Sequence, residues 1–414
     1  MELILAPHCY YSRNSFHTWK IIDFRHRRSD VKECRRNEKN GRGLVMAAVY
    51  AFIMVVLCFG VFMVEKPSTQ AAEFRNESFA DYIYISNKER DPYRNVILRF
   101  WTPDTFWAKV HSNDTIRISG TYDRPRFVYR VTSSAGWIEP PDNHGRFDEG
   151  WGYRPPIIFP DRAYEIRQFN GIVPALGTYN PDSLTQIVFS DSTLYVRYCG
   201  PFETPDHEIV IRCFPDFIAD APRYTIPHSG ALFINGKVWI SASRGLGDIM
   251  DGPFPNKDSI SYHQFVSQGF AGQLTVATSD TLIITDNLIY RHSKPDYSVP
   301  TSVDSCPDIL GLISENWIMM GKDVRNTLYV NAALAAIRGA ISVQDIYHNW
   351  YPGWDNEKQL LTIWGTLANR NRGITHTTDY PPGHVRGFTS KHYIYDFRLR
   401  DNPPPHFLRT QGNR

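Results

Sequence analysis

The chain has 414 residues, of which 45 are Lys or Arg, 43 are Asp or Glu and 42% are hydrophobic. This is the composition of a globular protein with one large core or two domains, and six cysteines are too few for a disulfide scaffold. Beyond residue 64, 38 acidic residues outnumber 35 basic ones, which argues against a nucleic-acid partner.

Residues 1–43 form a basic leader, with ten Lys and Arg against five Asp and Glu. Residues 44–64 contain no charge and no proline, and as a helix they span about 30 Å, the thickness of a bilayer core. The basic flank stays in the cytoplasm. The sequence therefore predicts a single-pass membrane helix with a periplasmic or extracellular body. A central core helix and a secretory signal cut near Ala71 and Ala72 are the alternatives.

The start of this apolar run has a local signature. Lys39, Arg42 and Gly43 stand directly before "LVMAAVYAF". The arrangement resembles the leader of type IV pilins and pseudopilins, which implies cleavage between Gly43 and Leu44. Ala48 occupies the fifth mature position, where that family usually has Glu. The resemblance therefore points to a minor, PilX-type pilin or a plain anchor rather than to a major filament subunit.

Two kinds of local structure are expected after the anchor. In residues 65–94, Phe74, Phe79, Tyr82 and Ile83 recur at helical spacing, which predicts a helical stalk. Residues 95–229 contain strand-like runs such as "DTIRISG" and "HEIVIRCF" between proline-rich loops. This part is predicted to be β-rich.

Short β runs with Gly, Asn or Asp at their turns follow one another through residues 230–407, every 20 to 25 residues or so. Runs such as "INGKVWISA" and "TLIITDNLIY" are typical of adjacent edges of one coil, bent at a polar residue. This cadence favours a right-handed parallel β-solenoid, in which stacked coils bury each other's inner side chains. An antiparallel β-sandwich is the alternative. Residues 408–414 are read as a tail.

The run "HYIYDFRLRDNPPPHF" closes the predicted body. Together with the segment order before it, this run resembles an uncharacterised bacterial family over roughly residues 41–407. That family joins a pilin-type anchor to a β-helical outer domain and has no assigned activity. The most specific part of the resemblance comprises Tyr395, Asp396, Arg398, Pro404, Pro405 and Phe407.

The same run has a physical interpretation. Asp396 and Arg398 lie two apart on a predicted strand, so they share a face and could form a buried ion pair. The prolines after them offer no amide donors, so the segment is predicted to cap the open end of the stack.

Other candidate sites are weaker. Cys199 and Cys213 could close a disulfide loop in an oxidising space, with unpaired buried thiols as the alternative. Trp151, Trp350 and Trp354 are a candidate glycan platform, although aromatic residues also fill gaps beneath loops. Asp248 and Asp251 are too few for a calcium site or a glycosidase.

Polar groups elsewhere are more typical of turns and surfaces than of sites. This interpretation covers His111, Asn113 and Asp114, and also the cluster His376, Asp379, His384, His392 and Asp396. The sequence therefore predicts no catalytic residue, no metal and no cofactor. It predicts a membrane-anchored, pilin-like envelope protein whose partners are the membrane, other pilin-like subunits or glycans. A surface glycan-active enzyme or a glycan-binding module is the alternative.

Overall fold

The protein is described here by a computed structural model, which covers residues 77–101, 104–119, 124–138, 145–169, 184–203, 209–214, 218–244, 265–346, 356–379 and 382–410. The prediction of a mainly β protein is confirmed for these residues. Their helical turns are short: η2 (Phe79–Asp81), α3 (Tyr164–Arg167), η4 (Ile218–Asp220) and α4 (Arg398–Asp401). No helix within this part of the chain is long and apolar enough to cross a membrane. The predicted leader and anchor lie outside it.

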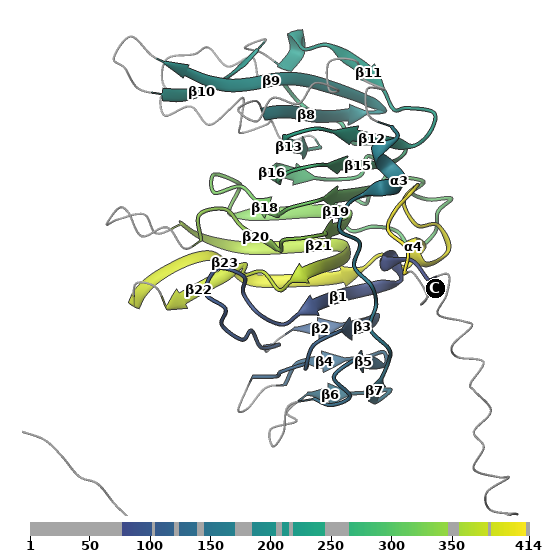
Figure 1. Cartoon of the computed structure of the whole chain (residues 1–414). Helices are drawn as coiled ribbons and strands as arrows, with labels where there is room; N and C mark the ends of the chain where they lie inside the picture. Colours follow the sequence, from purple (N-terminus) through teal and green to yellow (C-terminus); the bar gives the residue numbers. More distant parts are fainter. Residues whose placement is uncertain are drawn as a thin grey trace, which may run out of the picture. The chain divides into compact units, whose positions relative to one another are not determined.

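A long parallel ladder organises the sheet (Figure 1). Its strands, in spatial order, are β12 (Ala231–Ile234), β15 (Gln273–Thr278), β17 (Ile309–Ser314), β19 (Thr327–Ala336), β21 (Asn356–Asn371), β1 (Tyr82–Lys88), β3 (Lys109–Ser112), β5 (Val131–Ser133) and β7 (Trp151–Tyr153). Spatial order departs from chain order at β1, which pairs with the second half of β21. The first strands of the body therefore stack beyond its last ones.

The register of this ladder explains its sequence. One inward-facing column is apolar or aromatic in every layer: Leu232, Val276, Leu312, Leu334, Leu367, Tyr84, Val110, Val131 and Trp151. All but the last are buried. A strand alone cannot bury these side chains, so each layer depends on its neighbours for a core.

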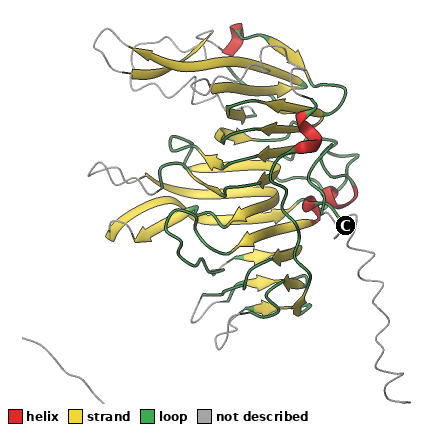
Figure 2. Ribbon diagram, viewed as in Figure 1, coloured by secondary structure: helices red, strands yellow, loops and turns green. Residues whose placement is uncertain are grey.

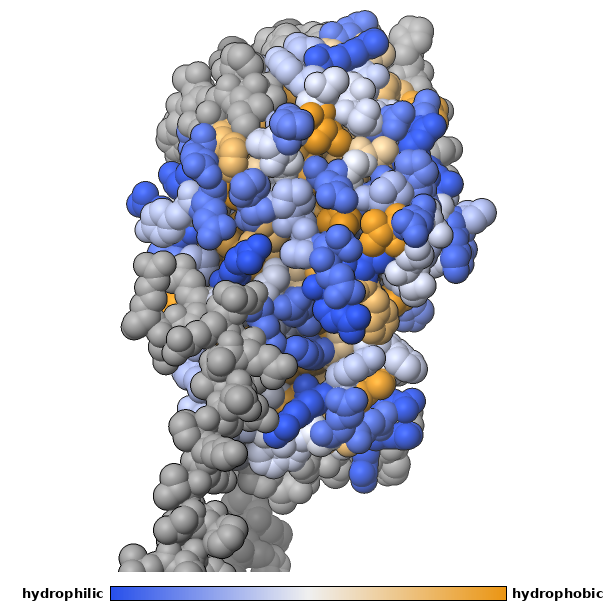
Figure 3. All heavy atoms as spheres, turned by 90° about the vertical axis from the view of Figure 1, so that its right-hand side faces the viewer, coloured by the Kyte–Doolittle hydropathy of each residue, from blue (hydrophilic) through white to orange (hydrophobic). Residues whose placement is uncertain are grey.

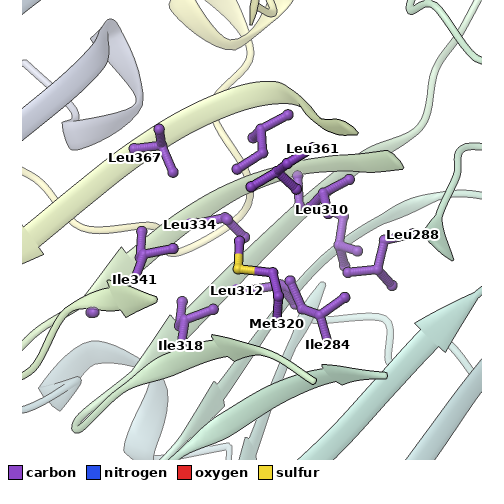
Figure 4. Packing of buried hydrophobic residues seen from close by; sticks show 14 of the residues in the cluster. Ile284, Leu288, Leu310, Leu312, Ile318, Met320, Leu334, Ile341, Leu361 and Leu367 are labelled. Carbon is purple, nitrogen blue, oxygen red and sulfur yellow. The ribbon is translucent and has the colours of Figure 1, made fainter. Parts of the chain in front are cut away.

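A second parallel ladder faces the first across the core. It comprises β8 (Leu184–Asp191), β13 (Lys237–Ala242), β16 (Leu282–Leu288), β18 (Ile318–Met320) and β20 (Ile341–Val343). Figure 4 shows side chains of both ladders meeting, with Ile284, Ile318 and Ile341 opposite Leu312 and Leu334. Burial of such aliphatic side chains stabilises the fold by about 1.5–3 kcal/mol each.

Serine side chains form hydrogen bonds where the chain turns at the end of a ladder strand. The hydroxyl of Ser314 donates to the carbonyl oxygen of Asp280 at 2.6 Å and accepts from the amide of Asn316 at 3.0 Å. The hydroxyl of Ser112 accepts from the amide of Asp114 in the same way. Short polar side chains of this kind satisfy turn amides that strands leave unpaired.

The strands that precede β3, β5 and β7 in the chain form a smaller parallel sheet. It consists of β2 (Thr105–Phe106), β4 (Arg126–Phe127) and β6 (Arg146–Phe147). Phe127 stacks between Phe106 and Phe147, with ring centroids 5.1 and 5.0 Å away and interplanar angles of 8° and 6°. An aromatic ladder thus runs through the interior of these layers.

The two ends of the stack differ. At one end β8 pairs antiparallel with β9 (Thr193–Glu203), which also pairs with β10 (Ile209–Phe214) and β11 (Arg223–Thr225). At the other end lies β7, which pairs with β5. The remaining strands are β14 (Gly269–Phe270), β22 (His376–Asp379) and β23 (Pro382–Tyr395), and β23 runs along the first half of β21.

Two segments cover the outer face of the first ladder. Residues 154–169 run from β7 to α3, and residues 396–410 form the C-terminal segment; Figure 2 shows the turns α3 and α4 outside the strands on this flank. Beneath these segments lies a second apolar cluster that includes Phe233, Ile313 and Ile85. The flank as seen in Figure 3 is mainly hydrophilic, with scattered hydrophobic residues.

Three expectations about organisation need correction. Tyr82–Lys88, expected within the helical stalk, is a strand, because Tyr82 to Ile85 is a continuous buried run in the middle of the ladder. The expected boundary at residue 230 does not divide two regions of the structure, because β8 before it pairs with β13 after it. The ladders are mostly parallel, contrary to the antiparallel sandwich alternative.

Candidate functional site

Of the expected glycan platform, only Trp151 lies in the described part of the chain. Trp151 lies on β7 and is 40% exposed. Its neighbour on the same face, Tyr153, is 63% exposed. Trp350 and Trp354 fall outside the described residues, as do Asp248 and Asp251 and the proposed cleavage site at Gly43 and Leu44.

A different set of aromatic residues gathers beside β2, β4 and β23, and we call it the aromatic corner: Trp107, Tyr129 and Phe397, with Arg126 and Arg130. The three rings are 46%, 38% and 38% exposed. The guanidinium of Arg126 lies 5.7 Å from the ring centroid of Trp107. The rings of Tyr129 and Phe397 are 6.5 Å apart although they come from distant segments.

Local sequence explains how the corner is built. Phe106 and Phe127 point into the core at equivalent positions of successive layers. Because side chains alternate along a strand, Trp107 directly after Phe106 is presented outward. Phe397 follows β23 and packs edge-on against buried Tyr395, with the ring centroids 5.1 Å apart, which fixes its orientation.

Arginines supply charge at the corner. Asp148 receives hydrogen bonds from Arg126 at 2.6 and 2.8 Å and from Arg146 at 3.0 Å. The hydrogen bond from Arg126 is the main reason why the pKa of Asp148 lies below its usual value. Arg130 lies over Gly152, where a Cβ would come 2.8 Å from its Nη2 atom. No carboxylate of the described residues pairs with the Arg130 guanidinium.

His111 and Asn113 do meet, but they serve the fold. The His111 ring is fully buried and lies 2.9 Å from the Thr132 hydroxyl and 2.8 Å from the Asn113 side-chain oxygen. Asn113 also accepts from the amide of Ile157, which ties the connecting segment to the ladder. Burial lowers the pKa of His111 to about 4. The ring is therefore neutral at pH 7.

Charged residues also lie inside the stack, where β23 meets β1. Arg372 donates to Glu89 at 3.0 Å and its guanidinium lies 3.9 Å from the ring centroid of Phe100. Burial raises the pKa of Asp104 and lowers that of Lys391. These charges lie between the last strand of the body and its first ones.

Cys306, His292 and Asp308 have the composition of a nucleophilic triad. His292 Nδ1 lies 2.9 Å from Asp308 Oδ2, and Cys306 Sγ lies 3.9 Å from the same oxygen. However, burial raises the pKa of the Cys306 thiol to about 11, so it is protonated at neutral pH. Asp308 meanwhile accepts from the amide of Gly272 at 3.0 Å. The geometry supports a structural role.

Asp396 and Arg398 form the expected buried ion pair. Arg398 Nη2 lies 2.6 Å from Asp396 Oδ2 and its Nε lies 2.9 Å from Oδ1, with both side chains almost fully buried. Burial alone lowers the pKa of Arg398, but its hydrogen bonds to Asp396 outweigh this effect and raise the pKa overall. The two residues do not lie on a strand, however, since β23 ends at Tyr395 and α4 begins at Arg398.

The rest of this motif covers a flank of the ladder rather than its end. Thr275 donates a hydrogen bond to the carbonyl oxygen of Pro405. A Cβ on Gly311 would come 2.8 Å from Pro404 and 2.9 Å from Phe407. The expectation of an end cap is therefore corrected: the prolines and Phe407 close the outer face of β15 and β17.

A disulfide joins Cys199 of β9 to Cys213 of β10. The two residues stand directly opposite each other in the antiparallel register, and both are buried. The remaining described cysteine, Cys306, is a free buried thiol. In the described residues, no group of three or more His, Cys, Asp or Glu side chains is placed to hold a metal ion.

Comparisons of the chain with family models, with curated proteins and with solved structures found no match. Function is therefore argued from the geometry. Sequence reasoning missed the aromatic corner, although a signal exists: "TFWAKV" and "RFVYRV" align as equivalent layers. The contribution of Phe397 could not be found in this way, because it comes from the far end of the chain.

Proposed function

We propose that this chain is a membrane-anchored envelope protein with a structural, assembly or adhesion role. Its anchor is the apolar run at residues 44–64, of pilin-like or pseudopilin-like type. Its body is a β-solenoid that lies outside the cytoplasm. The continuous registers of the two parallel ladders support the solenoid, because each layer repeats the inward-facing columns of the previous one.

The observation that carries the proposal is the Cys199–Cys213 disulfide. Disulfides persist in oxidising compartments, whereas cytosolic thiols are kept reduced. The pair lies in the antiparallel strands at one end of the stack, where it closes a short loop between β9 and β10. This favours the orientation that the basic leader predicts, with the body on the outer side of the membrane.

Trapping thiols in intact cells tests the location. Cells that express the full chain are precipitated with acid, the protein is alkylated in denaturant at neutral pH, and the peptides are examined by mass spectrometry. We expect Cys199 and Cys213 to be linked and to alkylate only after reduction. A C199S variant provides the control, because Cys213 should then be alkylated without reduction. Alkylation of both cysteines in the unreduced wild type would contradict an outer location.

Mass spectrometry of the N-terminus of protein isolated from membranes tests the pilin-like part. A mature chain that begins at Leu44 is expected. A chain that keeps its leader would remove the pilin-type processing and leave a plain anchor. A chain that begins near Ala71 would indicate a secretory signal and remove the anchor.

A further inference from the structure

The aromatic corner exposes three large rings on a rigid support. Scattered hydrophobic residues are normal at a protein surface, but rings gathered at one place mark a binding surface. Phe106 and Phe127 stack in the interior and so fix the backbone next to Trp107 and Tyr129. Tyr395 packs against Phe397 and fixes its ring. The hydroxyl of Tyr395 in turn donates to the carbonyl oxygen of Ala80 at 3.0 Å. The rings are thus positioned before any ligand arrives.

Two of the rings come from neighbouring layers of the sheet. Trp107 belongs to the layer of β2, and Tyr129 to the layer of β4, which pairs with β2 in parallel register. Neighbouring strands lie about 4.8 Å apart. In the layer of β2, the residue equivalent to Tyr129 is Ala108, which is small and buried. Tyr129 can therefore extend across that layer toward Phe397. Rings that come from successive layers suit an extended chain of sugars better than a compact ligand.

Guanidinium groups lie beside the rings, and that of Arg126 lies 5.7 Å from the ring centroid of Trp107. The single carboxylate of Asp148 is shared by Arg126 and Arg146, which leaves one positive charge in excess. Arg130 adds another charge; the Glu149 carboxylate beside it accepts a hydrogen bond from its backbone amide at 3.2 Å and not from its guanidinium. Guanidinium is planar and pairs with carboxylates through two parallel hydrogen bonds. The corner therefore combines stacking faces with groups suited to a carboxylate.

From this geometry we propose that the aromatic corner binds an acidic polysaccharide. Trp107, Tyr129 and Phe397 stack on the apolar faces of successive sugars, and Arg130 pairs with a sugar carboxylate. The inference deepens the proposed function, on which it rests for the location of the body, by naming the ligand class of an adhesion surface. It places glycan recognition on a side of the coils rather than at Trp151 on β7.

A nucleic acid offers both stacking and negative charge, so it must be distinguished from a glycan. The excess of acidic residues beyond the anchor disfavours a nucleic acid, because phosphate binding needs several basic groups along the strand. A sugar chain with one carboxylate per ring needs fewer basic groups than a nucleic acid does. The observations therefore favour the polysaccharide, and binding to an oligonucleotide is one outcome of the test.

The experiment uses the full chain in detergent micelles and biosensor tips that carry polygalacturonate. Tips with fully methyl-esterified polygalacturonate present the same sugars without their charges. Tips with single-stranded oligothymidylate present charge without sugars. We expect binding to polygalacturonate, with affinity lower by at least about tenfold on both other tips. Equal or tighter binding to oligothymidylate, or no binding to polygalacturonate, would overturn the proposal.

Substitutions then locate the site. The double variant W107A/Y129A should weaken binding to polygalacturonate by about tenfold or more, and R130Q by about three- to tenfold. Y164A and R162Q are matched controls, because these exposed residues lie on the connecting segment near α3. Binding that is unchanged in W107A/Y129A, or weakened equally in the controls, would rule out the corner as the site.

The result also separates this inference from the proposed function. Binding to the tips depends on the corner alone, whereas the thiol trapping reports where the body lies. If the protein binds polygalacturonate through the corner but carries reduced Cys199 and Cys213 in cells, the binding site stands. The proposed location outside the cytoplasm is then wrong. Thermal unfolding of each variant shows whether a loss of binding reflects a loss of fold, and R130Q provides a second test if W107A/Y129A is unstable.

Discussion

The hydroxyl of Ser78 donates a hydrogen bond to the carbonyl oxygen of Leu408, which lies 330 residues away in the chain, at 3.1 Å. Ser78 also forms an antiparallel bridge with Arg409, and the amide of Phe79 donates to Leu408 at 2.9 Å. The first and last described segments of the body are thus held together. They meet beside β1, in the middle of the ladder rather than at either end.

The C-terminal segment depends on the Asp396–Arg398 pair. In D396N the Arg398 charge loses its partner while it remains buried, so we expect the free energy of unfolding to fall by about 3–5 kcal/mol. Urea denaturation measures this change. The double variant D396N/R398M should recover part of the loss, because no uncompensated charge remains.

The exposed pair Arg400–Asp401, at the end of α4, provides the control. D401N should leave the unfolding midpoint unchanged, because solvent screens this pair. If D396N were as stable as D401N, the ion pair would contribute nothing to the attachment of this segment.

The phenylalanine ladder is expected to dominate the stability of the layers from β2 to β7. Phe127 is fully buried between two stacked rings. Substitution F127A removes both contacts and leaves a cavity, so a destabilisation of about 3–5 kcal/mol is expected. F127L should cost less, because it retains most of the buried volume. Thermal unfolding that is unaffected by F127A would show that the interior is not packed as described.

His111 makes stability depend on pH. The folded ring has a pKa of about 4 because it is buried, whereas an unfolded histidine has a value near 6.5. Between these values the unfolded state binds more protons. The contribution of the neutral ring is therefore fully present above pH 6.5 and is lost as pH falls toward 4, by up to about 3 kcal/mol.

The measurement compares the wild type with H111Q by urea denaturation at pH 7.5 and pH 4.5. The comparison is needed because burial raises the pKa values of Asp81 and Asp104, which act in the opposite direction. We expect the wild type to lose more stability than H111Q on acidification. Parallel losses in the two proteins would mean that His111 is not buried in its neutral form.

Local patterns in the sequence predicted much of what is local in the structure. Short β runs with polar turns became the facing ladders, because alternation and turn chemistry act within a few residues. The pairing of Asp396 with Arg398 was expected for the same reason. The strand was not expected to end at Tyr395, because nothing in the alternation of "HYIYDFRLR" marks that point.

Long-range placement could not be predicted. Tyr82 and Ile83 fit a helical period with Phe79, and the run became a strand because β21 and β3 offer partners on both sides. The role of Pro404 and Phe407 on the flank depends on β15 and β17, far away in the chain. Tertiary contacts decided these cases against local preference.

Protease added to intact cells, with any outer envelope opened, tests the central claim most directly. The claim is that residues 77–410 lie outside the cytoplasm behind an anchor at residues 44–64. The account predicts that fragments of the body are released while a cytoplasmic marker protein stays intact. A body that is cleaved only after the inner membrane is broken would contradict it.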